Sequence, residues 1–394
     1  MNEPRYPYKE MSFEEDIAKL NEFYFFREFT FSENTFRKSP TEEVELADNI
    51  VWLDEPLIVY QLKERQPPSN TNSEKEQKWF KRNIIDSAKR QIRDTLDYLQ
   101  NHSNIQIQNH RGHIFDIKVT SLDSIHKLIL YKAHECLPEC CRNLKHHRSQ
   151  TAGFIHLISS DDYSGIVKTL LTPAEVADYL TFRETLVSKW EEDTLNLPEQ
   201  ALVGQYLSGD SEHRPNLHFI EYLRLLEHKA EEWDLSGIIS IFLDRITTGN
   251  PPADYYYIVR EIAKLKRNEL REFKTRFKLS MDKAKINEFT LPYRIALPRT
   301  SCGFVFIPLT HDFLERRQQF LQNLTYAHKY DQKLPKCIGV SFAPEEDGWY
   351  SVEWCYIEFQ WEYDQELENM LKQSNPFREV QVAELPQYTF GAEE

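Results

Sequence analysis

Three side chains that can bind a metal ion and activate water stand close together around one predicted hairpin. The stretch VELADNIVWLDEPLIVYQLKER, residues 44 to 65, contains two apolar runs that are separated by Asp-Glu-Pro at 54 to 56. Because strand residues two apart share a face, Gln61 and Lys63 point the same way from the end of the second run. Antiparallel pairing about the turn brings Asp48 near position 61 or 62. The pattern predicts a carboxylate, an amide oxygen and an ammonium group at one end of a hairpin.

This combination suits metal-assisted hydrolysis of a phosphodiester. Mg²⁺ prefers oxygen ligands such as a carboxylate, an amide carbonyl and water. A bound ion lowers the pKa of its water and neutralises developing charge, and a lysine beside it can orient that water. We therefore expect Asp48 and Gln61 to bind Mg²⁺ or Mn²⁺ and Lys63 to position the water. The alternative is a structural ion pair between Asp48 and Lys63 across the two strands.

The spacing of these residues resembles a known motif. An acid, twelve intervening residues and then Gln-x-Lys at the end of an apolar strand is similar to the PD-(D/E)XK restriction-endonuclease-like superfamily in its Q-x-K variant. Asp48 matches the Asp of the motif, Gln61 its second acid or Gln, and Lys63 its Lys. The resemblance covers about residues 10 to 160, and Gln61 departs from the usual acid. The stretch also resembles a group of bacterial proteins with an E-L-x-D strand, in which Glu45 is a second acid of the site.

The resemblance implies a fold and an activity. The fold is a mixed α/β sheet with flanking helices, and the activity is metal-dependent cleavage of nucleic acid, with DNA as the implied substrate. A helix at 12–24 takes the place of the first helix of that fold, and Glu14, Glu15 or Glu22 is its extra acid. The helix at 78–100 follows the third strand, and the implied nucleic-acid contacts are Lys89, Arg90, Gln91 and Arg93. By analogy with nucleases fused to unfamiliar segments, the chain resembles bacterial genome-defence (antiviral) proteins.

The periodicity of the first 190 residues agrees with such a domain. Ser12 with Glu15 is the signature of a capping box before the helix at 12–24. The helix at 78–100 has one apolar stripe, and a further helix at 172–190 begins with Thr172 and Pro173. Strands are predicted at these ranges: 25–36, 104–108, 113–119, 125–131 and 153–158.

Three segments follow from this pattern: an α/β domain at 1–190, an all-α segment at 191–290 and an α+β segment at 291–394. In the last segment, four strands surround a helix at 313–328.

Composition limits the partners. The chain has 394 residues and a formal charge of −15, whereas dedicated nucleic-acid binders are usually basic. Binding of nucleic acid would therefore depend on local basic patches, on metal ions or on a protein partner, and a homo-oligomer is another option. The polar start of the chain, the six Cys and the lack of a long apolar run predict a cytoplasmic protein that does not bind membranes. The acidic charge favours the second hypothesis, a non-catalytic interaction or regulatory protein with a degenerate nuclease-like fold.

Other polar clusters carry weaker predictions. The His and Cys residues of 134–147 lack a C-x-x-C pair, so we expect structural cysteines rather than structural Zn²⁺. The basic helix at 264–278 is either a solvated face or an arm that contacts phosphates. The group Tyr326, His328, Lys329 and Tyr330, like the pair Arg294 and Arg299, is either a polar site or ordinary surface.

Overall fold

A computed structural model describes nine ranges of the chain: 11–39, 41–65, 72–102, 105–117, 122–227, 255–345, 350–379, 381–384 and 386–388. The chain forms two compact units, 1–228 and 229–394. The helices that the sequence places in a separate middle segment divide between these units. Ala201 and Leu202 join a core with Phe154 of the first unit, whereas Phe273 packs on Phe304 of the second. The boundaries predicted at 190 and 290 therefore differ from the division at 228, because the helix that carries Ala201 joins the core of the first unit and the helix that carries Phe273 covers the sheet of the second.

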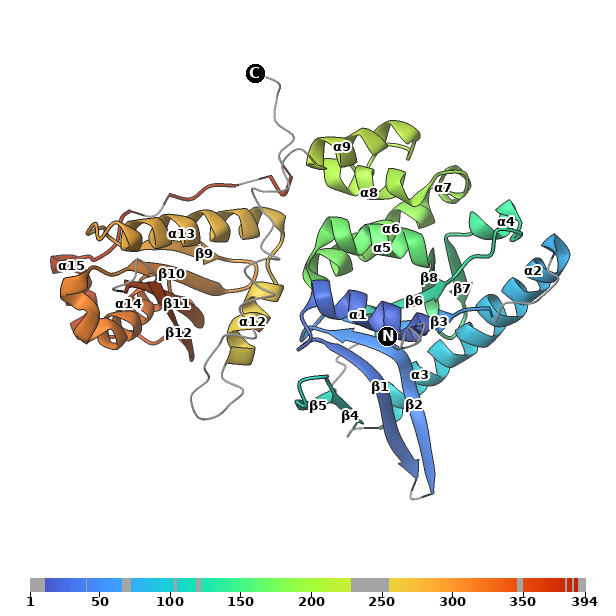
Figure 1. The fold of residues 1–394 in the computed structure, drawn as a ribbon, viewed down its shortest axis with the longest axis horizontal. Coiled ribbons are helices and arrows are strands. Elements are labelled where there is room, and N and C mark those ends of the chain that lie inside the picture. The colour runs from blue at the N-terminus through green and yellow to red at the C-terminus, as the bar shows by residue number, and fades with distance from the viewer. Residues whose placement is uncertain are drawn as a thin grey trace, which may run out of the picture. The chain divides into compact units, whose positions relative to one another are not determined.

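The first unit is built on a mixed sheet of six strands (Figure 1). Its order is β1 (Thr30–Ser39), β2 (Glu42–Trp52), β3 (Leu57–Lys63), β6 (Ile125–Tyr131), β8 (Gly153–Ser159) and β7 (His146–Ser149). β1, β2 and β3 form an antiparallel meander, β3, β6 and β8 are parallel, and β7 is antiparallel to β8. A separate pair consists of β4 (Ile105–Gln108) and β5 (Ile114–Ile117). The predicted mixed sheet is confirmed, and only the four-residue β7 was not predicted.

Helices cover both faces of this sheet, so the unit has three layers (Figure 1). On one face, Tyr163 of α5 (Ser160–Leu170) packs on Tyr60 of β3, beside α1 (Phe13–Phe25). On the other face, Ile84 and Ile92 share a core with Val59 of β3. That second helix is continuous through α2 (Ser73–Trp79), a π-helical section (Phe80–Ala88) and α3 (Lys89–Asn101).

The predicted helix starts after Ser12 and Thr172 are confirmed by their caps, whereas the helix predicted at 78–100 begins earlier, at Ser73. Ser12 and Glu15 form the capping box of α1, with the Ser12 N–H donating to Glu15 Oε2 at 2.9 Å. The Thr172 side chain caps α6 (Pro173–Lys189), and Pro173 occupies its first turn. The shorter helices of this unit are α4 (Glu139–Arg142), α7 (Glu191–Leu195), α8 (Glu199–Ser208) and α9 (Glu221–Glu227).

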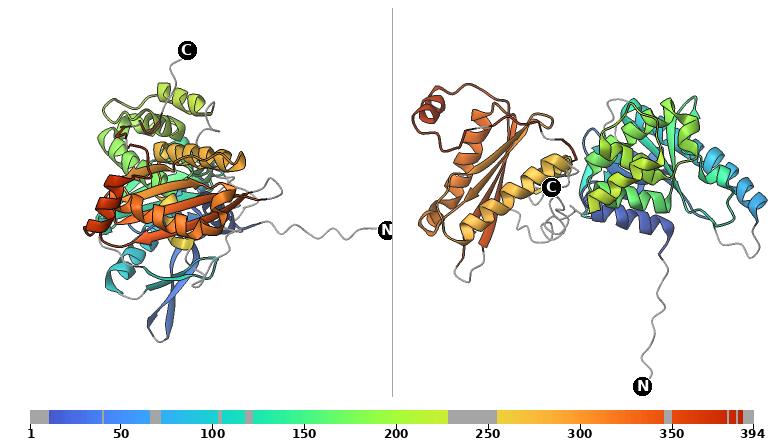
Figure 2. Two further views of the ribbon diagram at one scale, coloured as in Figure 1. Left: turned by 90° about the vertical axis from the view of Figure 1, so that its left-hand side faces the viewer. Right: turned by 90° about the horizontal axis from the view of Figure 1, so that it is seen from above.

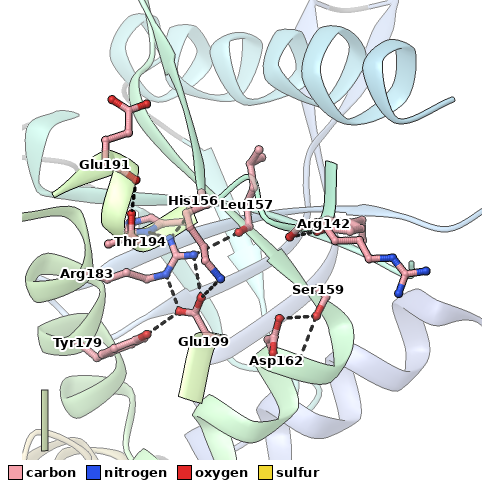
Figure 3. A network of polar contacts seen from close by, with 12 residues as sticks. Arg142, His156, Leu157, Ser159, Asp162, Tyr179, Arg183, Glu191, Thr194 and Glu199 are labelled. Carbon is pink, nitrogen blue, oxygen red and sulfur yellow. Dashed lines mark hydrogen bonds and ion pairs between the residues drawn. The ribbon is translucent and has the colours of Figure 1, made fainter. Parts of the chain in front are cut away.

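A buried ion pair joins α6 and α8 to the sheet (Figure 3). Arg183 Nε donates to Glu199 Oε1 at 2.6 Å, and its Nη1 donates to the Lys145 carbonyl at 3.0 Å. The Tyr179 hydroxyl donates to the same carboxylate at 2.5 Å. Burial alone would raise the pKa of Glu199, but the charges of Arg183 and Lys145 outweigh it and lower this pKa to about 2. Every charge here has a partner, which is the condition under which buried ions are tolerated.

The second unit contains a four-stranded sheet between two helices (Figure 2). Its order is β12 (Tyr350–Glu358), β11 (Lys336–Pro344), β10 (Cys302–Pro308) and β9 (Tyr293–Leu297), with only β10 and β11 parallel. Phe273 of α13 (Arg267–Lys285) packs on Phe306, whereas Leu321 of α14 (Arg317–Asp331) packs with Val305 on the opposite face. The remaining helices are α12 (Tyr255–Ala263) and α15 (Gln365–Gln373).

The basic stretch at 264–278 is only partly a solvated face. Arg267 and Lys274 are buried, and Lys264 Nζ lies 3.1 Å from Glu261 Oε1. Within the described ranges, no helix is long and apolar enough to cross a membrane.

The buried ion pair yields the first prediction. We expect Arg183→Met to lower the free energy of unfolding by about 3–5 kcal/mol, because the buried Glu199 would keep only Lys145, whose Nζ lies 3.6 Å away, to offset its charge. Changing Glu199→Met as well should recover part of the loss, since the double variant leaves Lys145 without its carboxylate. Urea denaturation of the two variants and the wild type measures this, and an equal loss in the single and double variants would contradict it.

Candidate functional site

The Asp48 carboxylate bridges the ends of β2 and β3. Its Oδ2 accepts a hydrogen bond from the Leu62 N–H at 2.5 Å and lies 3.4 Å from Lys63 Nζ. The same ammonium donates to the Leu62 carbonyl at 2.9 Å. The backbone pairing of the two strands runs from Trp52↔Leu57 to Asn49↔Tyr60, so Asp48 lies at its end. This confirms the predicted proximity of position 48 to 61 and 62.

Gln61 carries an unpaired polar atom in the interior. Its residue is 2% exposed, and its Oε1 is buried without a hydrogen-bond partner. Leu57 and Val59, which share its face of the strand, are part of the core beneath the π-helical section. A buried carbonyl oxygen without a partner costs free energy, and such atoms are rare in native interiors. An external donor or cation would satisfy it.

A second unpaired amide oxygen comes from α3. Gln91 Oε1 is also buried without a partner. Gln91 lies one turn before Thr95, whose hydroxyl donates to the Leu46 carbonyl of β2. That contact fixes α3 over the strand that carries Asp48. Of the four predicted nucleic-acid contacts, Gln91 is thus the one whose polar atom is turned away from solvent.

Two further carboxylates lie in the electrostatic neighbourhood of Asp48. Burial raises the pKa of Glu14, and the negative charge of Asp48 raises it further, while Lys63 opposes the shift. The pKa of Glu45 is raised by burial, by Asp48 and by Glu14, again against Lys63. Glu14, Glu45, Asp48 and Lys63 therefore influence one another directly. A carboxylate with a raised pKa is a stronger base than an ordinary one.

Glu14 is the acid of the first helix that reaches this group. Glu15 belongs instead to the capping box with Ser12. Glu22 contacts His110 and lies 3.9 Å from Arg27 Nε. Of the three candidate acids on the helix at 12–24, Glu15 and Glu22 therefore have other partners, and Glu14 is the one that interacts with Asp48.

A β-bulge lies between the two acids of β2. Asn34 pairs with Ala47 and Thr35 with Glu45, so Leu46 is an extra residue on β2. Bulges bend a strand and redirect its side chains, and they occur often beside active sites. In a regular strand, residues 45 and 48 would point to opposite faces. The extra residue Leu46 shifts this alternation between Glu45 and Asp48.

A chain of buried hydrogen bonds positions α1 against β2 and β3. Asn21 Nδ2 donates to Asn49 Oδ1 at 2.9 Å, and the Tyr163 hydroxyl donates to Asn21 Oδ1 at 2.7 Å. The Tyr60 hydroxyl lies 2.8 Å from that of Tyr163. Sequence reasoning missed this chain, although a polar Asn21 in the apolar stripe of an amphipathic helix was a signal for it. Through Asn21, the helix that carries Glu14 is tied to the residue after Asp48.

The exposure of the site is uneven. The side chains of Asp48 and Lys63 are 8% and 18% exposed. Glu14 and Glu45 are exposed overall, so the burial that raises their pKa values is only partial. The ion pair is mostly covered, while the carboxylates beside it face solvent.

The three predicted basic contacts on α3 have different surroundings. Arg90 is exposed, and Arg93 Nη2 lies 2.7 Å from Asp94 Oδ1. Burial lowers the pKa of His147 on β7, and the charge of Lys89 lowers it further, so Lys89 lies toward that strand. Their contact with nucleic acid stays a prediction.

The candidate ligands, a carboxylate and an amide oxygen, suit Mg²⁺ better than zinc. In the part of the chain that the structure describes, no three His, Cys, Asp or Glu side chains are arranged to hold a metal ion. Cys136, Cys140 and Cys141 are free thiols. Mg²⁺ commonly uses only one or two carboxylates, with waters and substrate phosphates completing its shell. Asp48 with the unpaired Gln61 oxygen would fit that smaller requirement.

The raised pKa of Glu45 yields the second prediction. The folded protein binds this proton more tightly than the unfolded chain, so stability is lost as the pH rises through the folded pKa. We expect Glu45→Gln to raise the free energy of unfolding at pH 7, because the folded state disfavours the charged carboxylate. The gain should be only about 0.2–0.5 kcal/mol, since solvent screens this exposed group. The gain should vanish near pH 3, roughly a unit below the ordinary pKa of a glutamate, where the carboxyl is largely protonated in both states.

Urea denaturation at the two pH values measures this difference. Glu42→Gln is the matched control, since Glu42 faces Lys38 at 3.7 Å and its removal should bring no gain. An equal gain from Glu45→Gln at both pH values would contradict the shared electrostatic neighbourhood.

Comparisons with protein-family models, with characterised proteins and with solved structures found no match to this chain. The resemblance to the PD-(D/E)XK superfamily therefore depends on the motif residues and on their placement.

Proposed function

We propose that the first unit is a metal-dependent phosphodiesterase with a restriction-endonuclease-like fold, which cleaves nucleic acid. One observation carries the proposal. Asp48 and Lys63 meet at the end of two paired strands, and the neighbouring Gln61 keeps a buried amide oxygen without a partner. A structural ion pair needs no such oxygen, whereas a cation site uses it.

Each residue has a role that follows from its chemistry. Asp48 and Gln61 would hold Mg²⁺ or Mn²⁺, which supplies charge neutralisation and an acidified water when bound. An ammonium has three N–H donors, and Lys63 directs two of them to Asp48 and to the Leu62 carbonyl. The third is available to orient a water or a phosphate oxygen. Glu14 and Glu45, whose pKa values are raised, are suited to take a proton from the attacking water.

The order of elements supports the same proposal. One helix, three meandering strands and a long helix follow one another from α1 to α3, and β6, which is parallel to β3, comes after the β4–β5 pair. A helix before the strands and a helix after the third strand are what the resemblance implies. We infer DNA as the substrate, in a cytoplasmic genome-defence role, with a homo-oligomer or a protein partner. The net charge of −15 makes binding depend on local positive charge or on that partner.

A non-catalytic interaction protein is the second candidate. The observation that favours it is the closure of the Asp48–Lys63 pair, whose side chains are 8% and 18% exposed. Both groups also have hydrogen-bond partners on Leu62. In that case the ion pair would only stabilise the hairpin.

The third prediction separates the two candidates. We expect the full chain to cleave plasmid DNA in Mg²⁺ or Mn²⁺, and Lys63→Ala to reduce the rate by about 100-fold or more. EDTA should abolish cleavage. Lys132→Ala is the matched control, because it removes a neighbouring lysine that pairs with Glu64 at 2.7 Å.

The opposing result is equally specific. If neither DNA nor RNA is cleaved in any divalent metal, and Asp48→Ala is at least as stable as the wild type, a simple nuclease is excluded. A partner-activated enzyme or an interaction module would then account for the site.

The fourth prediction concerns Gln61. Gln61→Met removes the unpaired oxygen while keeping a side chain of similar length. We expect it to raise the free energy of unfolding by about 1 kcal/mol and to lower cleavage at limiting Mg²⁺, because the oxygen is costly in the free protein and useful to the cation. Urea denaturation and a Mg²⁺ titration of cleavage test both halves. A less stable variant would show that Gln61 is structural.

A further inference from the structure

The second unit contains a pocket of about 370 Å³ that the proposed catalytic function does not use. Its lining comes from α14 and from the chain that joins β12 to α15. Its aromatic lining consists of Tyr326, Tyr330, Phe359, Trp361 and Tyr363. The remaining lining residues are Lys329, Glu362, Asp364 and Gln365. The volume falls in the range of roughly 300–1,000 Å³ that small-molecule sites occupy.

The aromatic rings form pairs across the pocket. The ring centroids of Tyr326 and Phe359 are 5.7 Å apart, and those of Tyr330 and Trp361 are also 5.7 Å apart. The Trp361 indole N–H donates to the Tyr330 carbonyl at 3.0 Å, which holds this ring in place. Phe359 and Tyr363 are 46% and 59% exposed. Exposed, oriented ring faces are suited to stack on a planar ligand.

Lys329 is the unusual member of this lining. It is 1% exposed, and in the part of the second unit that the structure describes, its ammonium makes no hydrogen bond or ion pair. Its one contact of note is with the face of Phe359, whose centroid is 3.5 Å from Nζ. Burial lowers the pKa of this lysine. A buried ammonium without an anion is unfavourable, so a negatively charged ligand would supply what the protein does not.

The acidic groups of the pocket do not cancel this charge. Asp364 Oδ1 accepts hydrogen bonds from the N–H groups of Glu366 and Leu367, so this carboxylate caps α15. Glu362 is exposed, and water screens its charge. Lys333, whose Nζ lies 5.5 Å from the Trp361 ring, is a second positive charge nearby, but it is offset by Glu368, whose Oε2 accepts a hydrogen bond from the Tyr330 hydroxyl at 3.3 Å.

We propose that this pocket binds a nucleotide-like ligand, in which a planar heteroaromatic ring stacks on the aromatic side chains and an attached phosphate pairs with Lys329. Neither the motif of the first unit nor its site assigns this binding. The His328 side chain, next along the helix, has a different role, since its Nε2 lies 3.0 Å from the Ile295 carbonyl inside the unit.

Isothermal titration calorimetry on the full chain tests the proposal with three probes: AMP, adenosine and inorganic phosphate. The titrations use EDTA and the Lys63→Ala background, so that the proposed catalytic site does not contribute. We expect AMP to bind at least about ten-fold more tightly than adenosine or phosphate, since only AMP satisfies both the rings and the ammonium. Lys329→Met should weaken AMP binding by about ten-fold or more while leaving the protein at least as stable.

Two variants make the result decisive. Phe359→Leu removes an exposed ring and should also weaken AMP binding, whereas Lys283→Met on α13, which removes a lysine paired with Glu288 at 2.7 Å, should not change it. The proposal is overturned if AMP does not bind at millimolar concentration, or binds no more tightly than adenosine or phosphate. It is also overturned if AMP binding is unchanged in both Lys329→Met and Phe359→Leu.

Discussion

The candidate site depends on one hydrogen bond, in which the Asp48 carboxylate accepts the Leu62 N–H. Backbone pairing between β2 and β3 stops at Asn49 and Tyr60. The side chain of Asp48 takes up the amide that the ladder leaves free. This contact fixes the carboxylate at the strand end, and the alternation of β3 then places Lys63 beside it.

Polar groups in the two units fall into two kinds. Arg183 and Glu199 are deeply buried, and each has several partners, which is how an ion pair holds helices to a sheet (Figure 3). Gln61 and Lys329 are as deeply buried, yet the Gln61 oxygen and the Lys329 ammonium make no hydrogen bond with the described chain. The first kind stabilises the fold. The second kind costs stability, and we infer that ligands compensate for it.

The candidate site of the first unit also contains charges that the protein does not fully compensate. Three carboxylates surround one ammonium near Asp48, so the charges there are not balanced within the protein. An excess of negative charge at a strand end favours a cation as the missing component. Because the whole chain is acidic, the proposed binding of a polyanion would depend on such a cation or on a partner.

The sequence by itself determined much of this structure. Local signals placed the capping box of α1, the strands of the central sheet and the meeting of Asp48 with the end of β3, because these depend on residues close together along the chain. Only the tertiary structure decided which acid of the first helix joins the site, since Glu14 is selected by the packing of Asn21 on Asn49, 28 residues away. The bulge at Leu46 and the grouping of the middle helices with two different sheets also depend on contacts between distant segments. The pocket around Lys329 arises in the same way, because α14 meets the chain after β12 only once the second sheet has formed.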